Sequence, residues 1–225
     1  MRQDSSRKIS PWPRALISSL ILLAGCALLL GACGDAGSAP PQAALVVQVV
    51  DGDTLVLAGG TKVRVLGIDA PELERDGQPA DFLAHKAKAA LAELTLDRTV
   101  SLSYDRLRYD HYGRLLAYLW LPDHTLVNAE LVRRGLARVY LIAPNLRYQK
   151  DLLTAQQEAI EAQRGVWQEL LKQDEPNYLG NRHTLRLHRP KCPLAATMAK
   201  ANQVRFTSLK DAYLQGYSPC RSCKP

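Results

Sequence analysis

Hydrophobic and polar residues alternate in short runs from residue 45 onward. The run Leu45–Val50 is rich in β-branched residues, and Gly59-Gly60 is typical of a hairpin turn. Longer stretches, such as Pro79–Leu96, space their apolar residues as a helix does. The pattern predicts strands over residues 45–50, 54–57, 62–68, 100–104, 114–120 and 138–142, and helices over residues 79–96, 126–135 and 147–163.

The predicted order is three strands, a helix, two strands and further helices. This order is typical of a five-stranded OB-fold barrel, which is a β-barrel with helices in the α+β class. We expect this barrel domain over residues 44–172. A small Cys/His-rich C-terminal domain is expected over residues 177–225. A unit of that size cannot build a large core, so it needs a metal or a disulfide.

Residues 1–32 have the order of an export signal. Basic residues come first, an apolar run covers Ala15–Leu30, and Gly31-Ala32-Cys33 follows. The stretch resembles a bacterial lipoprotein signal, in which a cysteine is lipidated after cleavage. Cys33 is the expected acceptor because a small, Pro-bearing linker (33–43) follows it, with Cys26 as the alternative. An uncleaved membrane anchor also fits. Either interpretation places the rest of the chain outside the cytoplasm, secreted or anchored in the cell envelope.

The net charge of +7 is unevenly distributed. Residues 181–225 carry nine Lys or Arg and one acid, whereas residues 33–180 carry 20 acids and 16 bases. A basic tail on a mildly acidic body indicates either a contact with a polyanion or a solvated surface.

Acids and arginines recur at the ends of the predicted strands. Asp53 follows the first strand, Asp69 ends the third, which also carries Arg64, and Arg114 begins a later one. Carboxylates from adjacent strand ends suit Ca²⁺ or Mg²⁺. Guanidinium groups bind phosphate, and a further carboxylate, Glu72, can orient or deprotonate water. The combination favours metal-assisted cleavage of phosphodiester bonds.

With these motifs in order, residues 44–167 resemble the staphylococcal nuclease (thermonuclease) family. The matching segments are Val49–Thr54, Arg64–Glu72, Asp110–Tyr118 and Val127–Ala137. The resemblance implies an OB-fold barrel of that type and a Ca²⁺-dependent nuclease that cleaves DNA and RNA with low sequence specificity.

The resemblance also implies the role of each site residue. Asp53, Asp69 and the backbone carbonyl of Ala70 would hold Ca²⁺, with Asp51 supporting them. The catalytic residues would be Arg64, Glu72 and Arg114. Tyr112 and Tyr140 would contact the nucleotide, and stacking on a tyrosine ring suits any base. For Tyr140, a place in the core beside Pro144 fits as well. A third tyrosine of the family is replaced here by Ile142.

In the tail, His188 and Cys192 precede a Cys220-x-x-Cys223 pair, a spacing typical of tetrahedral zinc. The segment resembles the metal-binding domain of Ada-type DNA repair proteins, with His188 where that family has cysteine. A disulfide between Cys192 and Cys220 or Cys223 is the alternative. We expect the tail to add affinity for nucleic acid without catalysis.

Two functions therefore fit the sequence. The first is an exported nuclease, and the second is an OB-fold lipoprotein that binds nucleic acid without cleaving it. The joint presence of Arg64, Glu72 and Arg114 favours the nuclease.

Overall fold

The computed structural model of the chain describes residues 42–172 and 174–225. The chain divides into Met1–Ala39 and Pro40–Pro225, and every described residue belongs to the second unit. Cys26 and Cys33, the predicted lipidation sites, lie outside the described residues. Within the described part, no helix is both long and apolar enough to cross a membrane.

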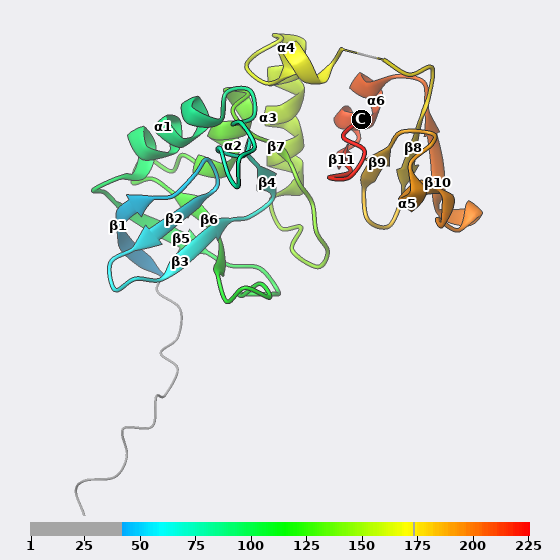
Figure 1. Cartoon of the computed structure of the whole chain (residues 1–225). Helices are drawn as coiled ribbons and strands as arrows, with labels where there is room; N and C mark the ends of the chain where they lie inside the picture. Colours follow the sequence, from blue (N-terminus) through cyan, green and yellow to red (C-terminus); the bar gives the residue numbers. More distant parts are fainter. Residues whose placement is uncertain (1–41, 173) are drawn as a thin grey trace, which may run out of the picture. The chain divides into compact units, whose positions relative to one another are not determined.

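Five strands close into a barrel in the order β1-β2-β3-β6-β5 (Figure 1). Neighbouring strands are antiparallel except β3 and β6, which are parallel. The predicted five-stranded OB-fold barrel is confirmed. Its strands are β1 (Ala43–Val49), β2 (Thr54–Leu57), β3 (Lys62–Val65), β5 (Thr99–Ser103) and β6 (Leu115–Trp120).

Apolar side chains at alternate strand positions fill the interior of the barrel, as period-two alternation dictates. Leu55 and Leu57 of β2, Val63 and Val65 of β3, and Leu115 of β6 have at most 1% of their surface exposed. This core fixes the register of the strands, because a slip by one residue would turn their apolar side chains outward.

The predicted third strand over residues 62–68 is wrong in one respect. The structure breaks it into β3 and a two-residue strand, β4 (Ile68–Asp69), which pairs with β7 (Arg138–Val139). Gly67 lies between them with a φ of 75°, and a Cβ there would lie 2.4 Å from the Leu152 side chain. The positive φ and the close side chain favour glycine at this turn, after which the chain pairs with β7.

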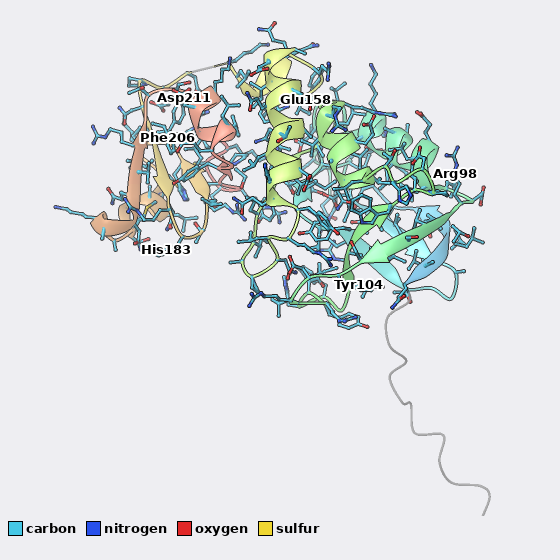
Figure 2. All side chains as sticks on the ribbon, turned by 180° about the vertical axis from the view of Figure 1, so that it is seen from behind. Arg98, Tyr104, Glu158, His183, Phe206 and Asp211 are labelled. Carbon is cyan, nitrogen blue, oxygen red and sulfur yellow. The ribbon has the colours of Figure 1, made fainter. Side chains whose placement is uncertain are left out.

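Four helices accompany the barrel: α1 (Ala84–Thr95), α2 (Val127–Arg133), α3 (Gln149–Glu161) and α4 (Trp167–Leu170). The helix predicted from residue 79 begins only at Ala84, because Leu83 adopts a left-handed conformation, with a φ of 67°. On α2, Arg133 lies 2.9 Å from Glu158 of α3, which is labelled in Figure 2.

The C-terminal region forms a four-stranded sheet in the order β10-β8-β9-β11. Its strands are β8 (Tyr178–Asn181), β9 (Arg186–His188), β10 (Gln203–Phe206) and β11 (Ser218–Pro219), with helices α5 (Pro193–Ala196), η1 (Lys200–Asn202) and α6 (Leu209–Leu214). Phe206, labelled in Figure 2, stacks edge-on against Tyr217. Tyr213 of α6 packs on Trp167, and its carbonyl accepts a 2.6 Å hydrogen bond from Gln156 of α3. The C-terminal region therefore shares a core with α3 and α4.

Candidate active site and metal cluster

The segment Asp51-Gly52-Asp53 forms a tight turn between β1 and β2. The Asp53 amide donates to the Asp51 carboxylate at 3.0 Å, so Asp51 stabilises the turn that presents Asp53. Gly52 is required by close approach, since a Cβ there would lie 2.6 Å from Ala70 and 2.8 Å from Ala87 of α1. The turn is thereby held against the segment that follows β4.

The barrel brings Asp53, Arg64 and Asp69 together from three elements. The Arg64 guanidinium lies 2.9 Å from Asp53 and 3.6 Å from Asp69. The Ala70 amide also donates to the Asp53 carboxylate, at 3.0 Å. Both aspartates are buried, with 9% and 4% of their surface exposed. Two desolvated carboxylates thus share one cation.

Burial raises the pKa of Asp53 to about 6, although Arg64 acts in the opposite direction. The nearby carboxylates of Asp51 and Asp69 raise it further. The charged form of the Asp53 carboxylate is therefore poorly stabilised by its buried surroundings. A cation bound by these hard oxygen donors would stabilise that form, so the residues fit Ca²⁺ or Mg²⁺.

Two arginines that the sequence interpretation missed also reach Asp69. Arg138 of β7 lies 2.5 Å from it, and Arg221 of the C-terminal region lies 3.4 Å from it. Arg138 stands opposite Asp69 in the β4–β7 pair. The alternation of β7 gave no sign of that register, and no local pattern joins Arg221 to a residue so far away in sequence.

Two hollows, each of about 380 Å³, adjoin this site. The first, which we call the tyrosine hollow, is lined by Arg64, Tyr112, Arg114 and Tyr140 among others. The second, the glutamate hollow, is lined by Asp69, Glu72 and Arg138 among others. The expected catalytic and substrate-binding residues thus divide between the two depressions, whereas Asp53 and Ala70 line neither. Arg221 lines both.

In the tyrosine hollow, Arg114 is held by Asp110, whose carboxylate accepts from its Nε at 2.7 Å and from its amide at 2.9 Å. The Tyr112 ring is 73% exposed, with the Arg114 guanidinium 5.4 Å and the His111 ring 3.8 Å from its centroid. Tyr140 is less exposed, and the Arg186 guanidinium lies 3.8 Å from its ring centroid. Ile142, which stands at a family tyrosine position, is 55% exposed on the wall of the same hollow.

In the glutamate hollow, Glu72 is exposed at the start of the loop after β4. Its backbone is fixed by Asp81, which accepts from the Glu72 amide at 3.1 Å and donates its own amide to the Glu72 carbonyl at 2.8 Å. The Glu72 side chain is therefore anchored at its base while its carboxylate remains accessible to water.

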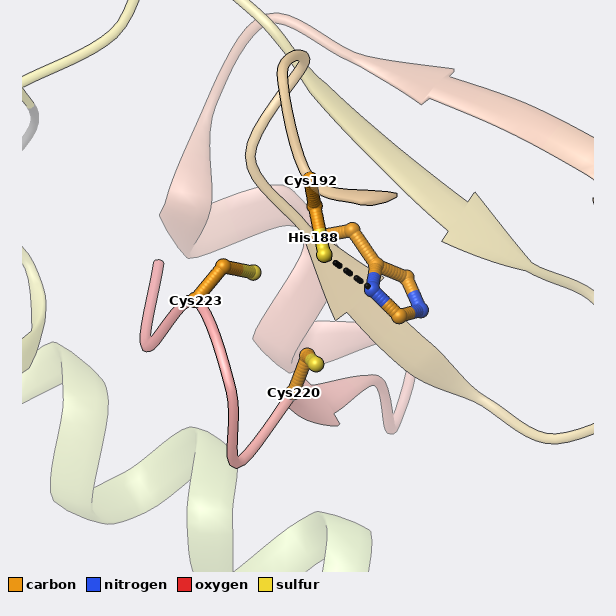
Figure 3. Close-up of side chains that lie close together, drawn as sticks. All are labelled: His188, Cys192, Cys220 and Cys223. Carbon is orange, nitrogen blue, oxygen red and sulfur yellow. Dashed lines mark hydrogen bonds between the residues drawn. The ribbon is translucent and has the colours of Figure 1, made fainter. Parts of the chain in front are cut away.

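The C-terminal region holds a second cluster, formed by His188, Cys192, Cys220 and Cys223. Figure 3 shows these four side chains pointing toward one another. One ligand atom from each lies within 4.8 Å of all the others, and none of the three cysteines forms a disulfide. Among residues 42–172 and 174–225, this is the one group of three or more His, Cys, Asp or Glu side chains so arranged.

The geometry and the protonation of this cluster fit zinc. Ligands of a tetrahedral zinc lie about 3.8 Å apart for Zn–S bonds of about 2.3 Å, a spacing that the cluster can reach. Burial and Arg186 lower the pKa of His188, which favours the neutral imidazole that binds metal. Burial and the neighbouring cysteines raise the pKa of Cys223 to about 12. A divalent cation would stabilise the thiolate against both effects.

Comparison with known proteins finds the same two parts. The family described as "Staphylococcal nuclease homologue" matches residues 62–169, and the "Metal binding domain of Ada" matches residues 166–225. A "Thermonuclease" of Staphylococcus hyicus is 32% identical over 133 residues, which are 58% of this chain and 78% of that protein. The Staphylococcus intermedius "Thermonuclease" is 35% identical, over 55% of this chain and 75% of that protein. An "Uncharacterized endonuclease" of Escherichia coli is 34% identical, over 54% of this chain and 74% of that protein.

Proposed function

Because the chain belongs to the staphylococcal nuclease family, it is a phosphodiester hydrolase, and we propose that it is a Ca²⁺-dependent nuclease that cleaves DNA and RNA with low sequence specificity. The observation that carries the proposal is the convergence of Asp53, Arg64 and Asp69, of which Arg64 lines one hollow and Asp69 the other. Asp53 and Asp69 are both buried, and two carboxylates so close together are costly to bury even beside arginines. A metal and a phosphate give them a function.

Asp53, Asp69 and the Ala70 carbonyl are the proposed ligands of Ca²⁺, which would neutralise the phosphate and help to activate water. The protein's own groups do the rest. Arg64 and Arg114 line one hollow and would bind the phosphate and the charge that develops on it. Glu72, accessible to water in the other hollow, would position the attacking water or accept its proton.

Low sequence specificity follows from how the substrate would be contacted. The residues proposed to meet it are arginines, which bind phosphate, and Tyr112, whose exposed face stacks on any base. Tyr140 is less available for stacking, because the guanidinium groups of Arg186 and Arg221 lie 3.8 and 5.8 Å from its ring centroid.

Digestion of single-stranded DNA by the full chain tests this proposal. We expect hydrolysis with Ca²⁺ and none after calcium is removed by a chelating resin. Mg²⁺ in place of Ca²⁺ serves as the matched control for a general effect of divalent cations. Hydrolysis that continues in the calcium-free sample would contradict the proposal.

We propose in addition that His188, Cys192, Cys220 and Cys223 bind zinc. Their approach without a disulfide and the match to a metal-binding family support zinc over a disulfide. Elemental analysis of the purified protein is expected to give one zinc per chain, and the Cys192→Ser variant is expected to lose it. Recovery of a metal-free protein with a disulfide bond would contradict this assignment.

Export and lipidation at Cys33, with Cys26 as the alternative, are proposed from the leader sequence. Mass spectrometry of the mature N-terminus distinguishes the two cysteines. An intact Met1 would indicate that the leader is retained as an anchor.

A further inference from the structure

Arg221 lies between the metal-cluster cysteines Cys220 and Cys223, yet its side chain reaches the candidate active site. One guanidinium nitrogen lies 3.4 Å from the Asp69 carboxylate, and the guanidinium carbon lies 5.8 Å from the centre of the Tyr140 ring. Arg221 lines both the tyrosine hollow and the glutamate hollow. A residue from the C-terminal region thus stands where the two depressions adjoin.

The contact with Asp69 does not account for this placement as a stabilising ion pair. The Arg221 side chain is 69% exposed, and exposed pairs of this kind contribute little to stability. Asp69 already has a closer partner in Arg138 at 2.5 Å. The bond to Asp69 uses one of the five N–H donors of Arg221, and the remainder of its guanidinium faces solvent-accessible space in the hollows.

The backbone around Arg221 is fixed by hydrogen bonds. The Cys220 amide donates to the Leu187 carbonyl of β9 at 2.8 Å, and the Lys224 amide donates to the Cys220 carbonyl at 2.9 Å. Cys220 and Cys223, two of the four cluster residues, flank Arg221 in the sequence. A metal bound there would hold Arg221 from both neighbours, as short metal-binding loops do.

Other contacts seat the C-terminal region against the nuclease domain. Arg186 covers the Tyr140 ring, and Gln156 of α3 donates to the Tyr213 carbonyl at 2.6 Å. Trp167 and Tyr213 pack together with their ring centroids 5.1 Å apart. Arg221 therefore projects from a surface that is packed in place, and not from a free tether.

We propose that Arg221 is a substrate-binding residue of the nuclease, which binds a phosphate of a nucleic-acid strand lying across the two hollows. In this proposal the Cys–His cluster holds the Arg221 guanidinium in position. The inference rests on the proposed function of the barrel site. It assigns a residue of the C-terminal region to the two hollows of the nuclease site. The sequence alone indicated only that this region adds affinity for nucleic acid.

Binding measured without hydrolysis tests the assignment. The full chain, its Arg221→Ala variant and its Arg221→Lys variant are titrated against a fluorescein-labelled single-stranded oligothymidylate in calcium-free buffer that contains no soluble chelator. We expect Arg221→Ala to weaken binding about tenfold, as the loss of a charge-assisted contact does. The slope of log affinity against log salt should fall by about 0.7, the value for one phosphate contact on a single strand. Lysine should restore the slope and part of the affinity.

Arg205→Ala is the matched control. Arg205 carries the same charge, is exposed on β10 of the same region, and lines a different hollow with Asp211 and Gln215. Its removal is expected to leave the affinity within about twofold and to leave the salt slope unchanged. Zinc content is measured for each variant, so that a loss of the metal is distinguished from a loss of the arginine.

The role of the cluster is tested by removing zinc from the wild type and from Arg221→Ala. We expect removal to weaken binding by the wild type about tenfold more than binding by the variant, because the variant has no guanidinium left to displace. An equal loss in both would show that Arg221 acts independently of the metal and would overturn that part of the proposal.

Two results would overturn the assignment of Arg221 itself. One is an Arg221→Ala variant that binds like Arg205→Ala. The other is an Arg221→Ala variant that hydrolyses DNA faster than the wild type, since Arg221 would then obstruct Asp69. These outcomes differ from a failure of the proposed nuclease function, in which the wild type binds the oligonucleotide but does not hydrolyse it with Ca²⁺.

Discussion

The barrel site and the Cys–His cluster both gather groups that repel one another, but they balance the charge in different ways. Around Asp69, three arginines supply positive charge from the protein itself, at 2.5, 3.4 and 3.6 Å. In the cluster, burial and the neighbouring cysteines raise the pKa of Cys223 to about 12. We therefore expect the barrel site to keep its shape without a metal and the cluster to depend on one.

Removal of the metals would show this difference most strongly. Zinc removal is expected to unfold residues 178–225, since structural zinc contributes on the order of 10 kcal/mol or more to a small domain. Calcium removal should leave the barrel folded. Hydrogen exchange measures both effects, because it reports the protection of the amides in β8–β11 and, separately, in β1–β6. If calcium removal reduced protection in the barrel as much as zinc removal reduces it in β8–β11, the comparison would be contradicted.

Glu72→Gln addresses the chemistry of the barrel site alone. The side chain is exposed, so the melting temperature should not change, whereas the rate of DNA hydrolysis should fall by about 10²–10³. Glu74→Gln is the control, because Glu74 is 61% exposed two residues away and pairs with His85. A rate that Glu72→Gln leaves intact would remove Glu72 from the mechanism.

Gln156→Met tests whether the two regions are stabilised together. The Gln156 side chain is buried, accepts from the Val139 amide at 2.7 Å and donates to the Tyr213 carbonyl at 2.6 Å. Methionine has a similar volume but leaves both backbone groups unpaired, which costs about 2–4 kcal/mol. Urea unfolding followed by tryptophan fluorescence measures the loss. Gln157→Met, at an exposed neighbouring position, should cost less than about 0.5 kcal/mol.

The calcium affinity of the barrel site is expected to depend on pH. Burial places the pKa of Asp53 at about 6 in the folded protein, above its ordinary value of 3.8. As the pH falls through 6, a proton competes with calcium, and the affinity should drop by up to about tenfold per pH unit. The calcium-free fold gains stability from the same protonation between pH 6 and 4, because the folded state binds the proton more tightly. Isothermal titration calorimetry between pH 5 and 8 tests this, and an affinity that does not vary with pH would contradict it.

Much of the fold was predictable from residues that are close in sequence. The alternation of Leu55 and Leu57 identifies a strand, and the spacing of Cys220 and Cys223 identifies a metal-binding pair. The start of α1 was not predictable, because Leu83 takes a left-handed conformation that its side chain gives no reason to expect. The break at Gly67 depends on Leu152, a residue in a distant helix.

The sequence by itself determined the barrel, the acids and arginines at its strand ends, and the Cys–His set. Each of these can be recognised from the types of residues present and their spacing over a short stretch of chain. Only the tertiary structure placed Arg138 and Arg221 against Asp69 and Arg186 over Tyr140. These contacts join residues separated by long stretches of chain. They arise from the register of β4 with β7 and from the core shared by Trp167 and Tyr213, and side-chain periodicity carries no information about either.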